Sequence, residues 1–134
     1  MFNDSIKNNI TFGRKYESKK FYKAIEIAHL SDVLKDLPDN ENTIVGDSGA
    51  KLSGGQIQRI SIARALYDSP ELLIFDEATS SLDINLSKSI LKKVQALKVE
   101  TTLLQVTHKL HETSSSDFVY VMKQGKIVED KNHL

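Results

Sequence analysis

Leu-Ser-Gly-Gly-Gln at residues 52–56 opens an apolar pattern of helical period that continues to about Tyr67. Ser53 suits a helix N-cap, so the sequence predicts a helix that starts at this serine. Two adjacent glycines at a helix start leave backbone N–H groups open to an anion, which the helix dipole also favours. Alone, such a stretch is typical of an ordinary capped turn, so its meaning depends on the rest of the chain.

A second informative stretch, Leu-Leu-Ile-Phe-Asp-Glu at residues 72–77, is a short apolar run that ends in two acids. The run predicts a buried parallel strand, and ligands of open α/β sheets bind at the carboxyl ends of strands. Asp76 could hold Mg²⁺ directly or through its waters. Glu77 faces another direction and could polarise an attacking water as a general base. The alternative is that the two acids mark only the solvated end of a strand.

The first half of the chain is predicted to be helical. Residues 19–37 carry an apolar stripe of helical period, with a break expected near residues 31–32. Pro38 and Pro70 are expected to follow helix ends. In the second helix, Ile57, Ile60 and Ile62 are expected on the apolar side.

The second half alternates strand and helix. After the strand at 72–75, Asp83 could cap a helix that reaches Leu97, and residues 101–106 predict another strand. Residues 118–122 and 127–128 predict a terminal hairpin. A strand, helix and strand after a helical block indicate an α/β core with a helical insert.

Polar residues follow the predicted strands. Ser-Ser-Leu-Asp at residues 80–83 needs no role beyond capping a helix. His108 directly follows the strand at 101–106, at the same sheet edge as Asp76 if the strands are parallel, where it could contact a terminal phosphate. We interpret His29, His111 and His133 as exposed loop histidines, since no histidine pair has metal-site spacing with acids.

Composition excludes several classes of protein. The 134 residues are 40% hydrophobic and 27% charged, with 18 basic and 18 acidic side chains and no cysteine. Zero formal charge argues against sequence-independent nucleic-acid binding, and the absence of cysteine excludes disulfides and thiolate sites. No apolar run approaches the ~20 residues of a transmembrane helix, and the start of the chain does not resemble a signal peptide.

Taken in order, these motifs resemble those of the ATP-binding-cassette (ABC) transporter ATPases. Residues 52–56 match the family's signature motif, and residues 72–77 resemble its Walker B strand with the catalytic glutamate. Residues 80–83 are similar to its D-loop, and His108 to its switch histidine. Three further stretches are also similar: the segment after the Q-loop, the loop that touches transmembrane domains in exporters, and the closing hairpin, at residues 2–10, 43–49 and 125–129.

The resemblance implies an α/β, P-loop NTPase-like partial domain. Residues of about 1–70 would form the helical subdomain with the signature motif, and about 71–134 the core lobe with Walker B, D-loop and switch histidine. It implies ATP and Mg²⁺ as cofactors, with Asp76 on the metal. The implied catalytic residues are Glu77 and His108, and the implied ATP-binding residues are Ser53, Gly54, Gly55, Gln56 and Asp83.

Three positions depart from the family pattern. Asp47 stands where exporters usually have glutamate, Gln105 is polar within an otherwise apolar strand, and Lys131 replaces a common glycine. None is one of the implied catalytic residues.

The family's phosphate-binding Walker A loop, Gly-x-x-x-x-Gly-Lys-Ser/Thr, occurs nowhere in the sequence. The chain therefore resembles the C-terminal half of a nucleotide-binding domain, cut at the Q-loop. The expected partners are the missing Walker A portion, a second nucleotide-binding domain in a head-to-tail dimer, and a transmembrane domain, at the cytoplasmic face of a membrane. The isolated chain is expected to have little or no ATPase activity, and the sheet edge left open predicts poor solubility.

Two other functions remain open. The chain could be a non-hydrolysing module that docks on an intact ATPase partner. It could also be the C-terminal lobe of an SMC or Rad50-type ATPase, although residues 2–43 lack the heptads of the coiled coil that precedes the signature there. The transported substrate, and the choice between homodimer and heterodimer, are left open by the sequence.

Overall fold

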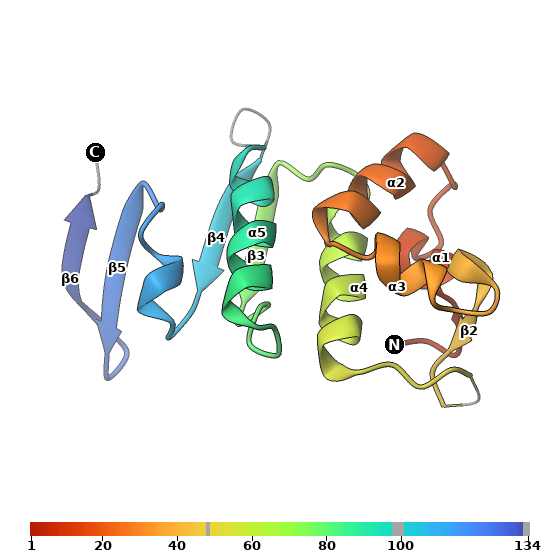
Figure 1. Ribbon diagram of the computed structural model, residues 1–134. Coiled ribbons are helices and arrows are strands. Elements are labelled where there is room, and N and C mark those ends of the chain that lie inside the picture. Colours follow the sequence, from red (N-terminus) through yellow and green to blue (C-terminus); the bar gives the residue numbers. More distant parts are fainter. Residues whose placement is uncertain (48, 98–100, 133–134) are drawn as a thin grey trace.

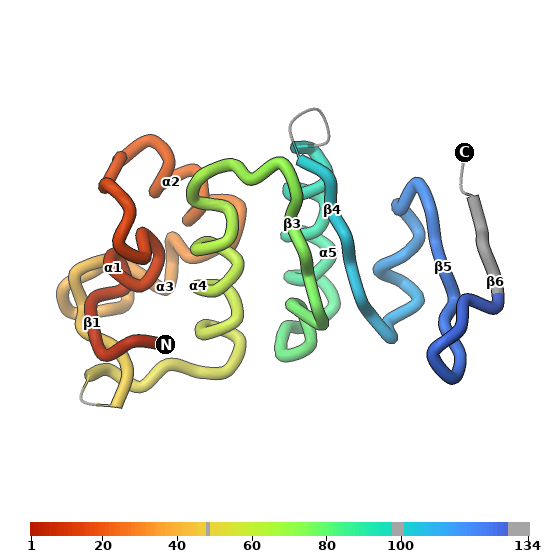
Figure 2. The backbone as a smooth tube through the Cα atoms, turned by 180° about the vertical axis from the view of Figure 1, so that it is seen from behind, coloured from red at the N-terminus to blue at the C-terminus, as the bar shows by residue number. Residues whose placement is uncertain are grey.

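The computed structural model describes residues 1–47, 49–97 and 101–132, without the side chains of residues 129–132. The chain forms an elongated molecule in which helices occupy one end, a strand–helix–strand unit the middle and a β-hairpin the other end (Figures 1 and 2). The three parts follow one another in the order of the sequence. The motifs at residues 52–56 and 72–77 therefore lie where the helical part meets the central part.

The helical part is built around one long helix. Its elements are β1 (Asp4–Ser5), α1 (Ile6–Thr11), α2 (Ser18–Ile27), α3 (Ser31–Lys35), a 3-10 turn (Asn40–Asn42), β2 (Ile44–Val45) and α4 (Gly54–Leu66). Helix α4 contacts both α1 and α2, and β1 pairs with β2 in antiparallel fashion. The predicted helix from Ser53 is therefore confirmed, with Ser53 as its N-cap.

The apolar stripe at residues 19–37 forms two helices. The backbone of His29 adopts a left-handed conformation with φ of 53°, which ends the first helix before Ser31 starts the second. The expected break is thus confirmed, slightly earlier than residues 31–32. Helix α3 ends at Lys35, so Leu37 and Pro38 lie beyond it.

A buried asparagine anchors the start of the chain to α4. The Asn9 side chain donates to the carbonyls of Phe2, Asp4 and Ser5 and accepts from the Phe2 N–H. Its backbone carbonyl accepts from the Arg64 guanidinium at 2.6 Å. Every polar atom of this buried amide thus has a partner, which holds the N-terminal segment in one conformation.

The central part contains the predicted strand–helix–strand unit. It consists of β3 (Leu72–Asp76), α5 (Ile84–Gln95) and β4 (Thr102–Val106), and the two strands are parallel neighbours in register Leu72 to Thr102 through Asp76 to Val106. A 3-10 turn (Leu110–Glu112) leads to β5 (Phe118–Lys123) and β6 (Lys126–Asn132), which form the predicted antiparallel hairpin. The α/β fold class is confirmed.

One hydrophobic core joins the helical and central parts, since side chains from α1, α2, α4, β3 and α5 belong to the same buried cluster. Ile60 and Ile62 lie in it as expected, whereas Ile57 is exposed because it lies on the side of α4 that faces solvent. The division into lobes near residue 70 stays a prediction.

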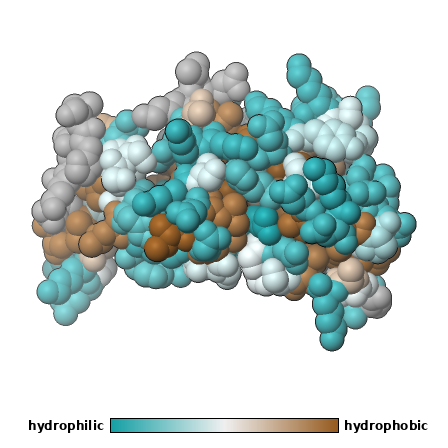
Figure 3. Space-filling view, in the orientation of Figure 1, coloured by the Kyte–Doolittle hydropathy of each residue, from teal (hydrophilic) through white to brown (hydrophobic). Residues whose placement is uncertain are grey.

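The β3–β4 sheet is buried on one face only. Leu73 and Phe75 are buried, but side chains of the opposite face are more than half exposed: Leu72, Ile74, Leu104 and Val106. The expectation of a fully buried strand is therefore wrong for this chain, because its layer of helix covers a single face. Apolar surface is also visible at the hairpin end of the molecule (Figure 3).

Candidate functional site

The carboxyl ends of β3 and β4 bring two sequence-predicted residues together. The Nδ1 atom of His108 lies 3.0 Å from Oε1 of Glu77, although the two residues are 31 positions apart. The Glu77 N–H donates to the Val106 carbonyl at 2.9 Å, so the two strand ends are tied by backbone as well. Glu77 has a φ of 47°, uncommon for a residue with a side chain, and such strain clusters at functional sites.

Asp76 ends β3 and pairs in register with Val106, with its carboxylate exposed at the same edge. Within residues 1–47, 49–97 and 101–132, no group of three or more acids and histidines could enclose a metal ion. A single exposed carboxylate fits Mg²⁺, which keeps several waters and takes its remaining ligands from phosphates. It does not fit a closed protein cage of the kind that holds Zn²⁺.

The start of α4 is built as predicted from the glycine-rich stretch. The Ser53 Oγ atom accepts from the Gln56 N–H at 3.2 Å, and Gln56 Oε1 accepts from the Ser53 N–H at 2.8 Å, which together form a capping box. The first-turn N–H groups of Gly54 and Gly55 stay outside the box. A Cβ added to Gly54 would meet nothing closer than 3.8 Å, so this glycine is not crowded by neighbouring side chains.

A residue without a role in the sequence-based prediction links this helix to the loop that follows β3. Gln58 Nε2 donates to the Ser80 Oγ at 2.8 Å and to the Glu77 carbonyl at 3.3 Å, and Gln58 Oε1 accepts from the Ser81 N–H at 2.9 Å. Its amide therefore fastens the loop after Glu77 to the second turn of α4. Its position two residues after the glycine-rich stretch does not by itself predict this bridge, because a polar residue there also suits a solvated helix face.

Asp83 caps α5, as predicted. Its Oδ1 atom accepts from the N–H groups of Asn85 and Leu86, each at 3.0 Å. The negative charge of Asp83 also acts on Arg59. Burial lowers the pKa of the Arg59 guanidinium, and the attraction to Asp83 partly opposes that shift. The Arg59 side chain donates to the His29 carbonyl at 2.7 Å, so α4 is also tied to the end of α2.

Two other histidines are not the exposed loop residues that the sequence suggested. His29 is half-buried, with Nε2 2.9 Å from the Ser89 Oγ, because its left-handed backbone turns the ring against α5. His111 is half-buried as well, and its Nε2 atom is buried without a hydrogen-bond partner. His133 lies outside the described residues.

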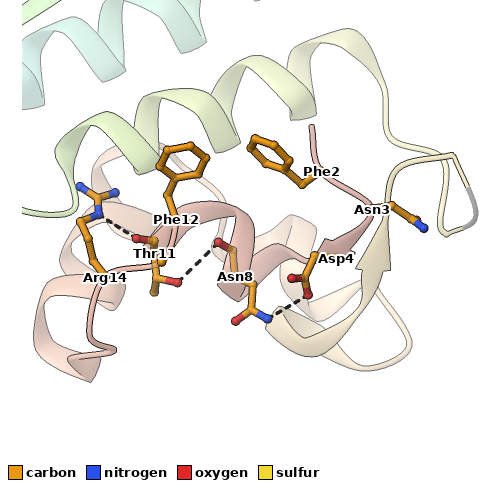
Figure 4. Close-up of a pocket in the computed structure, with 8 residues that line it drawn as sticks. Phe2, Asn3, Asp4, Asn8, Thr11, Phe12 and Arg14 are labelled. Carbon is orange, nitrogen blue, oxygen red and sulfur yellow. Dashed lines mark hydrogen bonds between the residues drawn. The ribbon is translucent and has the colours of Figure 1, made fainter.

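A separate open groove of about 770 Å³ lies on the helical part, far from the strand ends. The exposed rings of Phe2 and Phe12 face each other at 5.3 Å along it, and the Arg64 guanidinium lies over both. Asp4 and Asn8 lie on its polar side (Figure 4).

Comparison with known proteins agrees with the motif order. The profile of the ABC transporter family matches residues 2–80. The ATP-dependent lipid A-core flippase of Pseudoalteromonas translucida is 43% identical over all of this chain, and that of Ralstonia nicotianae 40% identical over 99% of it. The chain spans about a quarter, 23%, of the length of both relatives.

A solved structure shows the same fold. A bacterial Atm1-family ABC exporter with ATP bound superposes on 99% of this chain with a TM-score of 0.89 and 37% sequence identity, and the chain covers 23% of it. In the described part of this chain, no helix has the length and apolar character needed to cross a bilayer. On the family profile, the relatives and the shared fold, the chain belongs to the ABC transporter family.

Proposed function

We propose that this chain supplies the water-activating residues and the signature motif of an ATPase that drives export across a membrane. The observation that carries the proposal is the contact of 3.0 Å between His108 and Glu77 at the carboxyl edge of a parallel sheet. In this fold class that edge is where ligands bind. The Gln58 bridge ties the same loop to α4, which fixes the glycine-rich helix start relative to Glu77.

Each side chain then has a role. Glu77 orients the attacking water and accepts its proton, and His108 holds the Glu77 carboxylate and contacts the terminal phosphate. Ser53 and the N–H groups of Gly54 and Gly55 face the phosphates of an ATP, with Gln56 holding the serine in place. Mg²⁺ neutralises phosphate charge when bound, and Asp76 would hold it. Asp83, which already caps α5, would also contact the nucleotide.

The principal phosphate cradle has to come from another segment. No Walker A sequence occurs in the 134 residues, so the lysine and glycine-rich loop that hold the β and γ phosphates must be supplied by another polypeptide or by a further part of the same protein. We propose a head-to-tail arrangement in which the signature motif faces an ATP held by a second nucleotide-binding domain. The chain alone then turns over little or no ATP.

The groove at Phe2 and Phe12 is proposed as the contact with a transmembrane domain. Residues 45 and 46 adjoin it, since Val45 pairs with Asp4 and a Cβ at Gly46 would lie 2.9 Å from the Asn3 α-carbon. The parent assembly would lie at the cytoplasmic face of a membrane. Because two of the relatives are named lipid A-core flippases, a lipid is a reasonable first cargo to assay.

A second function is that of a module that docks on an intact ATPase through its signature motif at residues 52–56 and hydrolyses nothing. The two functions differ in their dependence on Glu77. A docking module needs only its signature surface, whereas a hydrolytic partner also needs the Glu77 carboxylate.

ATP-dependent association with a polypeptide that carries a Walker A half tests the shared part of both functions. We expect binding that requires Mg-ATP and is lost in Gly54→Glu, because a carboxylate there repels phosphate while the open space around Gly54 accepts the side chain. Gly54→Gln, of similar size without charge, should retain more binding. Association that does not depend on ATP, or an equal loss of association in Gly54→Glu and Gly54→Gln, would contradict the proposed phosphate-binding site at the start of α4.

A further inference from the structure

A buried carboxylate lies behind the catalytic edge, outside the roles assigned above. The Glu112 side chain, on the 3-10 turn after β4, is completely shielded from solvent. Its Oε1 accepts from the Thr79 Oγ1 at 2.7 Å, and its Oε2 accepts from the Gln105 Nε2 at 2.7 Å and the Thr107 Oγ1 at 2.9 Å. Three short hydrogen bonds therefore converge on this one group.

Two of these partners belong to the two loops that carry the catalytic pair, and the third, Gln105, lies on β4. Thr79 lies two residues after Glu77, and Thr107 directly precedes His108. Thr107 Oγ1 also accepts from the Lys109 N–H at 3.0 Å, so the backbone on both sides of His108 is fixed through one hydroxyl. Glu112 thus joins one loop to the other.

Lys109 closes the network. Its Nζ atom donates to the Thr79 carbonyl at 2.8 Å and lies 3.8 Å from Glu112 Oε1. Thr79 is consequently held at both its hydroxyl and its carbonyl. A buried carboxylate is tolerated only when such donors and an opposite charge surround it, so separation of the two loops would cost its Oε1 atom the hydrogen bond from Thr79.

The network also accounts for Gln105, which is polar within an otherwise apolar strand. Its amide lies on the half-buried face of β4 and donates to Glu112 from seven residues away. An apolar residue would leave that carboxylate oxygen with one donor fewer.

We propose that Glu112 is a positioning residue that sets the contact between Glu77 and His108 by fastening their loops together. The inference rests on the proposed function, because it gives that contact a part in hydrolysis. Glu112 itself touches neither water nor phosphate. It acts through Thr79 on one side and Thr107 on the other.

The coupling between Glu77 and His108 can be measured by NMR without hydrolysis. We would record the chemical shifts of the His108 ring at one fixed pH in the 134-residue chain with and without Glu77→Gln, and repeat the pair in a Glu112→Gln background. We expect Glu77→Gln to change the His108 ring signals in the parent chain, because the two side chains are in contact, and to change them by less than about half as much beside Glu112→Gln. Thr107→Val removes the hydrogen bond between Thr107 and Glu112, so it should also weaken the coupling between Glu77 and His108. This variant provides the test if Glu112→Gln does not fold.

The kinetic arm uses the reconstituted ATPase. Glu112→Gln should lower kcat by roughly tenfold and change KM by less than about twofold, since it misplaces groups that act at the transition state. Glu26→Gln, an exposed carboxylate near Lys93, is the matched control and should leave both unchanged. Undiminished Glu77–His108 coupling in folded Glu112→Gln or Thr107→Val protein would overturn the proposal. An inactive parent assembly would contradict the proposed hydrolysis alone, because the NMR result does not depend on it.

Discussion

At the scale of single residues, the site depends on backbone conformations that few side chains favour. Glu77 occupies the left-handed region at the end of β3, and its N–H still reaches the Val106 carbonyl. This conformation turns the carboxylate away from the strand and toward His108. The cost of such a conformation, about 1–3 kcal/mol, is met by the surrounding loop contacts.

The two glycines that start α4 should respond differently to alanine. A Cβ at Gly55 would lie 3.1 Å from the Ser81 carbonyl oxygen, whereas a Cβ at Gly54 would approach no atom closer than 3.8 Å. We expect Gly54→Ala to leave the free energy of unfolding unchanged or raise it by up to about 1 kcal/mol. Gly55→Ala should be less stable than Gly54→Ala by about 1 kcal/mol in urea denaturation, because the loop must move. The reverse order would refute this packing.

His29 should make stability depend on pH. Burial, together with the charges of Lys93 and Arg59, lowers its pKa below the ordinary 6.5. The unfolded chain therefore binds more protons than the folded chain just below pH 6.5, so the free energy of unfolding falls as the pH drops through that window. His29→Asn, which tolerates the left-handed backbone, should flatten this slope between pH 7 and 5. An unaltered slope would assign the dependence to another group.

At the scale of elements, side-chain caps set where helices begin. The Asp83 carboxylate accepts from two N–H groups of the first turn of α5. Asp83→Ala should lower the free energy of unfolding by about 1 kcal/mol, while Asp83→Asn, which can still accept, should lose less than half of that. Thermal denaturation of the three proteins side by side measures the difference. Equal losses in both variants would show that charge rather than capping is responsible.

Short-range sequence patterns predict the helices and strands of this chain well, but they predict few of the contacts between them. The cap at Ser53, the strand at 72–75 and the hairpin follow from short-range patterns, and all are confirmed, with the strand one residue longer than predicted. The juxtaposition of Glu77 and His108 could also be expected, since parallel strands end at one edge. The Gln58 bridge and the Glu112 network could not, because they join residues whose positions depend on tertiary packing. For the same reason the half-burial of His29 was missed.

At the scale of the whole molecule, a large apolar surface is left without cover. One face of the β3–β4 sheet exposes Leu72, Ile74, Leu104 and Val106, and exposed apolar patches of this kind mark interaction surfaces or cause association. Such a face suits a chain that works within a larger assembly. The low solubility that the sequence predicts from an open sheet edge stays a prediction.

The isolated chain is therefore expected to self-associate. Light scattering coupled to size-exclusion chromatography should show a mass that rises with concentration. Replacing Ile74 and Leu104 by threonine keeps the preference for strand and removes apolar surface, so the double variant should stay closer to one chain per particle. A parent chain that remains monomeric at every concentration would contradict this expectation.

The central claim is that Glu77 and His108 form the hydrolytic pair of a composite ATPase, and turnover of Mg-ATP by the chain mixed with a Walker A half tests it most directly. The chain alone should show little or no turnover, and the mixture should hydrolyse ATP. Glu77→Gln should reduce that turnover by about 10²–10⁴-fold and leave ATP-dependent association intact. His108→Ala and Ser53→Ala should each reduce it as well. Turnover in the mixture that persists undiminished in Glu77→Gln would contradict the account.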